Sequence, residues 1–181
     1  KQFGWTNDDC TSFILGNQEI FKDKVDFNPP STQTVGLFPA FEPKGTLESW
    51  KNMIEFYNRD KFELHQFVVG SSFGSVLMNF SPVNCAALHL HSKDSGVGKT
   101  TAMEAAASIW GYPKDLVLDE NDTHNIKMHR GEIYHNLPLY LDELTNSRAT
   151  ELSNLVYQLT GGKQRGRMAS GGNIERYRGD A

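Results

Sequence analysis

The stretch that decides the fold is Lys93–Thr100, with the sequence Lys-Asp-Ser-Gly-Val-Gly-Lys-Thr. It lies between a short apolar run at 85–90 and a segment at 99–110 whose pattern is typical of a helix. The phosphate-binding pattern Gly-x-x-x-x-Gly-Lys-Ser/Thr is expected in this setting, after a strand and at the start of a helix. The stretch matches that pattern at its last three positions and departs from it at Lys93, where the pattern has glycine.

The chemistry of this loop depends on backbone N–H groups that curl around an anion at a helix N-terminus. Gly96 and Gly98 supply the conformational freedom for that curl, Lys99 is expected to reach the β- and γ-phosphates, and Thr100 is expected to bind Mg²⁺. The alternative is a glycine-rich turn that precedes Lys-Thr by chance, but the flanking strand and helix patterns favour ATP binding. The predicted nucleotide-binding residues are Asp94, Ser95, Gly96, Val97, Gly98, Lys99, Thr100 and Thr101.

A second motif is the apolar run 137–141, which ends in Asp142 and Glu143. Because the carboxyl ends of parallel strands meet at one edge of a sheet, these acids are expected beside the phosphate loop. Asp142 would then hold the water shell of Mg²⁺, and Glu143 would orient a water for attack on the γ-phosphate. The alternative is that both acids only cap the following helix. The predicted catalytic residues are Glu143 and Lys99, and the predicted Mg²⁺ ligands are Thr100 and Asp142.

The second half of the chain alternates between the two kinds of secondary structure. Strands are expected at 85–90, 115–118 and 137–142, and helices at 99–110, 123–135 and 147–159. Strands that alternate with helices predict a parallel sheet with helices packed on it. The predicted fold class is therefore α/β, a P-loop NTPase preceded by a β-meander and a helical segment.

The first half is organised differently. Short alternating segments in the first 21 residues predict a small β-meander, and four prolines within 26–45 predict an irregular connector. A helix is expected to begin after Thr46 as N-cap, and another is expected over 62–80. Gly70 and Gly74 are expected to admit a second backbone at close range. The predicted domains are 1–45, 46–82 and 83–181.

Composition excludes several classes of protein. Hydrophobic residues make up 38% of the 181 residues and charged residues 22%, which argues against disorder. No apolar run is long enough to span a membrane, and no secretory signal is visible. The two cysteines, Cys10 and Cys85, favour the reducing cytoplasm, which would be the host's if the source is viral. Since the chain starts with Lys1 rather than Met, we expect a piece of a longer protein.

Together, the phosphate loop and the acidic strand resemble those of P-loop ATPases of the additional-strand catalytic-glutamate type. That group includes AAA-plus proteins and hexameric replicative helicases. Other passages resemble phage and mobile-element primase–helicase proteins: Phe3–Trp5 with Phe13–Gly16, Leu88–His91 and Ala105–Gly111. The resemblance implies a homo-oligomeric ring, with a hexamer as the expected form, and ATP bound between protomers. It also implies a sensor strand between the strands at 85–90 and 137–142, expected beyond Ala181.

The charge is unevenly distributed along the chain. The net charge is −4, but residues 161–181 contain five basic and two acidic side chains. This end of the chain has the pattern of a β-hairpin around the turn at 170–172. By resemblance, such a hairpin grips single-stranded or fork DNA in a ring's pore, with Tyr177 available to stack on a base. The alternative is an exposed hairpin with ordinary surface charges. The predicted DNA-binding residues are Lys163, Arg165, Arg167, Arg176 and Arg178.

These features favour an ATP-driven motor on DNA, a replicative helicase. A second hypothesis is an AAA-plus switch or loader that remodels a nucleoprotein complex without unwinding DNA. A third is a nucleotide-binding structural module in which Glu143 has no catalytic part. The histidines at 124, 129 and 135 are expected to be surface or packing residues rather than metal ligands.

Overall fold

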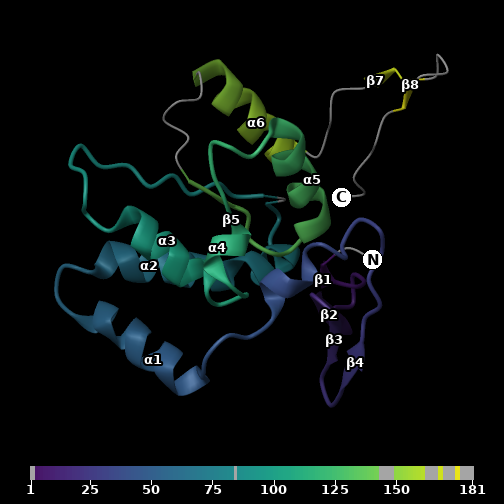
Figure 1. The fold of residues 1–181 in the computed structure, drawn as a ribbon, viewed down its shortest axis with the longest axis horizontal. Helices are drawn as coiled ribbons and strands as arrows, with labels where there is room; N and C mark the ends of the chain where they lie inside the picture. The colour runs from purple at the N-terminus through teal and green to yellow at the C-terminus, as the bar shows by residue number, and fades with distance from the viewer. Residues whose placement is uncertain (1–2, 84, 143–148, 162–166, 169–173, 176–181) are drawn as a thin grey trace.

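A computed structural model describes residues 3–83, 85–142, 149–161, 167–168 and 174–175 of the chain (Figure 1). The strands are β1 (Gly4–Trp5), β2 (Ser12–Leu15), β3 (Gln18–Phe21), β4 (Val25–Phe27), β5 (Val117–Leu118), β6 (Tyr140–Leu141), β7 (Arg167–Met168) and β8 (Ile174–Glu175). The α-helices are α1 (Leu47–Glu55), α2 (Glu63–Gly74), α3 (Lys99–Ala107), α4 (Pro113–Leu116), α5 (His124–Tyr134) and α6 (Ala149–Gly161). Three 3₁₀ helices complete the set: η1 (Phe38–Phe41), η2 (Phe56–Asn58) and η3 (Ser75–Phe80).

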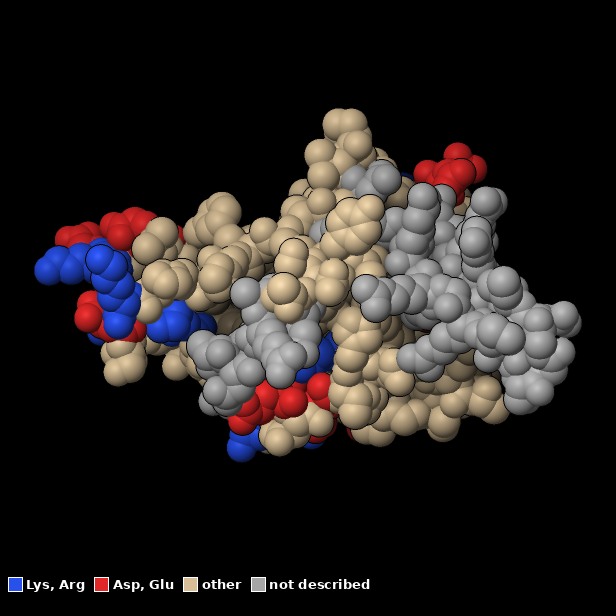
Figure 2. Space-filling view, turned by 90° about the horizontal axis from the view of Figure 1, so that it is seen from above, with Lys and Arg blue, Asp and Glu red and all other residues tan. Residues whose placement is uncertain are grey.

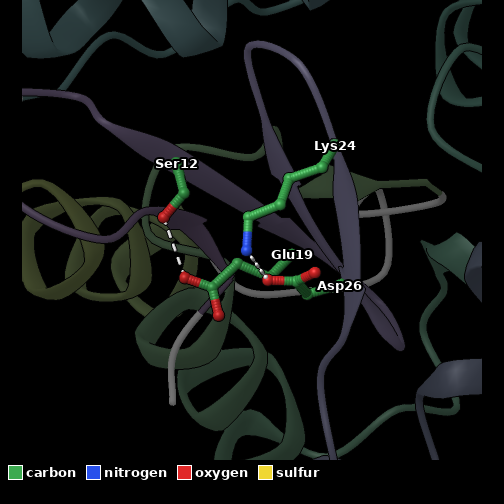
Figure 3. A network of polar contacts seen from close by, with 4 residues as sticks. All are labelled: Ser12, Glu19, Lys24 and Asp26. Carbon is green, nitrogen blue, oxygen red and sulfur yellow. Dashed lines mark hydrogen bonds and ion pairs between the residues drawn. The ribbon is translucent and has the colours of Figure 1, made fainter.

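The predicted meander is present as a four-stranded antiparallel sheet in the order β1-β2-β3-β4. Ser12 pairs with Phe21 across β2 and β3, and alternate residues of β2 are buried. Figure 3 shows two polar contacts on this sheet: the Ser12 hydroxyl donates to the Glu19 carboxylate at 2.8 Å, and Lys24 is paired with Asp26. Such a sheet, with one half-buried face, follows directly from the alternation in the sequence.

The meander is joined to the second half of the chain through Phe3. Its ring is fully buried and lies 4.9 Å from the ring of Phe41 and 6.3 Å from that of Tyr134. Its backbone N–H donates to the carbonyl of Ile133 at 2.8 Å. One hydrophobic core therefore includes side chains from the meander and from α3, α5 and β6.

The helical segment begins as predicted. The Thr46 side chain accepts from the Ser49 N–H at 3.1 Å and caps α1. The second predicted helix ends earlier than expected, because α2 stops at Gly74 and continues as η3. The close backbone approach predicted at Gly70 and Gly74 is wrong: a Cβ at either position would meet nothing within 4 Å. Neither glycine therefore packs against another backbone within the part of the chain that the structure describes.

The parallel sheet is the pair β5 and β6, in which Val117 faces Tyr140. The strand expected at 85–90 is wrong: the described residues of this run form no strand, and those from 85 to 89 are exposed. A short apolar run does not by itself show what will cover it, and a strand needs a neighbour's backbone to pair with. In the described part of the chain β6 pairs only with β5, and because the run 85–90 forms no strand there, the predicted strand order is not tested. That order stays a prediction.

The basic end of the chain contains the antiparallel pair β7 and β8, in which Arg167 faces Glu175. This is the pairing that a hairpin over this region predicts. The turn at 170–172 lies outside the described residues.

A buried group of hydrogen bonds ties α2, α3 and β6 together. The hydroxyls of Ser72 and Tyr140 lie 2.9 and 3.0 Å from the carbonyl of Ala106, and 2.5 Å from each other. The indole N–H of Trp110 donates to the Ser72 hydroxyl at 2.9 Å. Burial raises the pKa of Tyr140 far above its ordinary range, so its hydroxyl keeps the proton. We call these four residues the Ser72 network.

We predict that Ser72→Ala lowers the free energy of unfolding by about 1–3 kcal/mol, because the buried Tyr140 hydroxyl and the half-buried Trp110 N–H lose their Ser72 partner. The measurement is urea denaturation followed by fluorescence. The matched control is Ser71→Ala, since Ser71 is the exposed neighbour on α2 and bonds only within its own helix, to the Val68 carbonyl. We expect a change of about 0.5 kcal/mol or less for the control. Equal losses in the two variants would contradict the network's role.

Candidate functional site

The phosphate-loop residues lead directly into α3, which begins at Lys99. Gly98 is the N-cap residue, with φ 82° and ψ 19°, and Gly96 also has a positive φ of 71°. The Gly98 carbonyl accepts from the Ala102 N–H at 2.9 Å, which closes the first turn of the helix. Left-handed backbone at both positions curls the chain just before the helix, as a backbone anion site requires.

The departure at Lys93 carries no backbone strain. Among the described residues, the non-glycine residues with positive φ are Cys10, Lys61 and His135. Lys93 therefore lies in an ordinary backbone region, where a side chain is tolerated. The loop reaches its curled form with glycine at two positions only.

The Lys99 side chain folds back over the loop. Its ammonium group donates to the Asp94 carbonyl at 3.3 Å, while the Asp94 N–H donates to the Ser92 hydroxyl at 3.1 Å. The other predicted ligand groups are open to solvent, since Ser95, Thr100 and Thr101 are exposed. A cation and a helix N-terminus thus face one accessible loop, which suits an anionic ligand.

The side of the loop toward α2 is supported by side chains that sequence reasoning did not assign to the site. The Tyr57 hydroxyl donates to the Thr101 carbonyl at 3.5 Å. Burial, assisted by the negative charge of Glu104, raises the pKa of Tyr57, so the phenol remains a donor. His65 reaches the Val97 carbonyl. In sequence both residues lie in segments with a helical pattern, and no motif links them to the loop.

Asp142 directly follows β6 and is half-buried. Its N–H donates to the Leu118 carbonyl at 2.7 Å, which extends the β5–β6 ladder by one bond. Tyr140, two residues earlier, reaches Ala106 on α3 through the Ser72 network. The strand that carries Asp142 is thus packed on the helix that follows the loop. Glu143 lies outside the described residues.

Thr100 and Asp142 offer a hydroxyl and a carboxylate, the hard oxygen donors that Mg²⁺ prefers. The described residues contain no group of three or more His, Cys, Asp or Glu side chains that could hold a metal ion. Magnesium bound with a nucleotide needs no such cage, because phosphates and waters supply most of its ligands. The donor chemistry of the two predicted residues therefore fits Mg²⁺ held mainly by a nucleotide.

Four of the predicted DNA-binding residues, Lys163, Arg165, Arg176 and Arg178, lie outside the described residues. The fifth, Arg167, belongs to β7, and only its backbone is described. On the face seen in Figure 2, positive and negative side chains are mixed at the left end and near the lower edge, and a group of acidic side chains lies at the upper right. The described part of this face therefore shows no predominantly basic patch.

A polar cleft of about 490 Å³ lies beside β5 and α4. Basic and acidic side chains both line it, among them Lys114, Asp119, Asp122 and Arg130. Arg130 already donates to the Asp115 carbonyl, and the Asp122 carboxylate accepts from the Asp119 N–H. The predicted phosphate-loop residues do not line this cleft, so it is separate from the candidate site.

We predict that Gly98→Ala lowers the free energy of unfolding by about 1–2 kcal/mol, because φ is 82° and an added Cβ would lie 3.1 Å from His65 Nε2. Urea denaturation measures the loss. The control is Gly36→Ala, where φ is not positive and nothing lies within 4 Å of a Cβ. We expect the control to be neutral or slightly stabilising. A neutral Gly98→Ala would show that the loop does not need this backbone conformation.

No helix among the described residues combines the length and apolar character needed to cross a membrane. No curated protein and no solved structure matches the chain. A family model with the description "Domain of unknown function (DUF927)" matches residues 1–178. Because this match covers almost the whole chain, the protein belongs to the DUF927 family.

Proposed function

We propose that the chain is the ATPase part of a motor that moves on DNA, a replicative helicase of the phage or mobile-element type. The observation that carries this proposal is the curled loop before α3, with left-handed glycines at 96 and 98 and Lys99 folded over it. A nucleoside triphosphate is the ligand that suits a backbone anion site with one lysine and one hydroxyl at a helix start.

In the proposed reaction, the loop amides from 94 to 101 bind the phosphates, and Lys99 neutralises charge on the β- and γ-phosphoryl groups. Magnesium would supply further charge neutralisation, held by Thr100 and by Asp142 through its water shell. Glu143 orients and polarises the attacking water. Tyr140 of β6 contacts Ala106 of α3. This contact supports the proposal that the acids after β6 and the loop before α3 act in one site.

Ring assembly is part of the proposal, with ATP between protomers of a homo-oligomer. Apolar side chains on α2 and η3 are exposed, including Leu64 (78%), Phe67 (61%) and Phe80 (66%). Exposed apolar surface of this kind is available for contact between protein chains. The second candidate, a switch or loader without unwinding, uses the same ATP site. A strand-separation assay on fork DNA distinguishes the two.

We predict that Lys99→Ala abolishes Mg²⁺-dependent ATP turnover, because the variant loses the cation that faces the β- and γ-phosphates. The measurement is phosphate release by the full chain, with and without single-stranded DNA. The control is Lys51→Ala, which removes an exposed lysine of α1 and should leave turnover unchanged. Wild-type turnover in Lys99→Ala would show that the assigned site is wrong. Absence of ATP turnover by the wild-type chain, with and without DNA, would favour the structural module.

We predict that Arg165→Ala combined with Arg167→Ala weakens binding to single-stranded DNA and reduces the log–log salt slope by about 1–2. Basal ATP turnover should change little, because neither residue belongs to the nucleotide site. Fluorescence anisotropy over a salt series gives both quantities. The double variant Lys22→Ala with Lys51→Ala removes two exposed lysines from other elements and serves as control. An unchanged salt slope in the arginine variant would show that the hairpin does not contact DNA.

A further inference from the structure

One polar contact joins α2 directly to the phosphate loop. His65 Nε2 lies 3.1 Å from the carbonyl oxygen of Val97, although the two residues are 32 positions apart. A carbonyl oxygen only accepts hydrogen bonds, so the contact requires the ring to carry its hydrogen on Nε2 and to donate it. The loop residue that receives this bond immediately precedes Gly98, the N-cap of α3.

The His65 ring is held in place on its other sides by aromatic rings. The ring of Tyr57 lies 5.6 Å away and nearly parallel, at 20°, and the ring of Phe62 lies 5.0 Å away. Nδ1 is buried and has no hydrogen-bond partner among the described residues. A hydrogen on Nδ1 would lack an acceptor there, so this environment favours the same tautomer that the contact with Val97 requires.

The geometry of the peptide group gives this contact a directional effect. The described residues contain no cis peptide bond, so the unit that joins Val97 to Gly98 is planar and trans. In such a unit the C=O and the N–H point in opposite directions. A carbonyl held toward His65 on α2 therefore directs the Gly98 N–H to the opposite side of the loop.

Glycine at position 98 permits this arrangement, since a Cβ there would lie 3.1 Å from His65 Nε2. We propose that His65 is a positioning residue: its Nε2–H fixes the Val97–Gly98 peptide plane and so aims the Gly98 N–H at the bound phosphate. This role rests on the proposed function, because it assumes that the loop binds a nucleotide. His65 itself does not touch the reacting atoms.

Two substitutions separate the donated hydrogen bond from the packing of the ring. His65→Phe keeps an aromatic ring between Tyr57 and Phe62 but removes the donor. His65→Gln keeps an amide N–H at a similar distance from the backbone. We expect His65→Phe to raise KM for MgATP roughly tenfold while kcat changes much less, and His65→Gln to stay within about twofold of wild type.

The matched controls are His129→Phe and His129→Gln, which change an exposed histidine on α5. Both should leave KM unchanged. Nitrogen-15 NMR of the wild-type imidazole provides a readout that does not depend on ATP, and the Nε2–H tautomer of His65 is expected. A merely structural role would lower the thermal midpoint of His65→Phe without the KM-against-kcat split and without rescue by Gln.

Three results would overturn the proposal: an unchanged KM in His65→Phe, equal defects in the Phe and Gln variants, or the Nδ1–H tautomer in wild type. Failure of the wild-type chain to bind MgATP would overturn the proposed function, and the positioning role with it. A wild-type chain that binds MgATP normally, beside His65 variants that also bind normally, would overturn only the role of His65.

Discussion

The carbonyl of Ala106 is the point at which α2, α3 and β6 are joined. Its oxygen lies within hydrogen-bond distance of the hydroxyls of Ser72 of α2 and Tyr140 of β6, inside a buried region. Buried polar groups are costly when they lack partners, so the three elements are most stable in the one relative position that satisfies all of them. The helix that starts at the phosphate loop and the strand that ends at Asp142 are thereby fixed against each other.

The loop before α3 is exposed to solvent on one side and packed against other elements on the other. Its outer side is exposed, while its inner side rests on η2 and α2 through Tyr57 and His65. Two glycines hold left-handed backbone that other residues adopt only at a cost. In the proposed nucleotide site, a loop that is already organised in this way would lose less entropy on binding its ligand. Because His65 of α2 contacts the loop at Val97, α2 belongs to the proposed site although it precedes the loop in sequence.

Local patterns predicted the parts of this molecule that depend on neighbouring residues in sequence. The Thr46 cap, the meander and the start of α3 at Lys99 follow from side-chain chemistry and alternation over a few residues. The strand at 85–90 was wrong because an apolar run does not reveal whether another strand lies beside it. The role predicted for Gly70 and Gly74 was wrong for a related reason. A glycine leaves room on the surface of a helix, but the sequence does not show whether another backbone occupies it.

The contacts that support the site were beyond sequence reasoning altogether. Whether His65 meets Val97, or Tyr57 meets Thr101, depends on how α2 and η2 lie against α3 and the loop before it, and no spacing between these residues encodes that arrangement. The acid Asp142 could be placed at a strand end from its motif, but its link to the loop runs through Tyr140 and Ala106. Nothing in the apolar run 137–141 indicates that the Tyr140 hydroxyl bonds to the Ala106 carbonyl.

The docking of the meander has a consequence for synthesis of the chain. The Trp5 N–H donates to the side chain of Asn136, 131 positions away, and Phe3 bonds to Ile133. A ribosome adds about 5–20 residues per second, so the first strand leaves the tunnel on the order of ten seconds before its docking surface exists. During that interval Phe3 can meet Phe41 but not Tyr134, and contacts of such long range close slowly. The strand β1 therefore completes its contacts only after Asn136 has been synthesised.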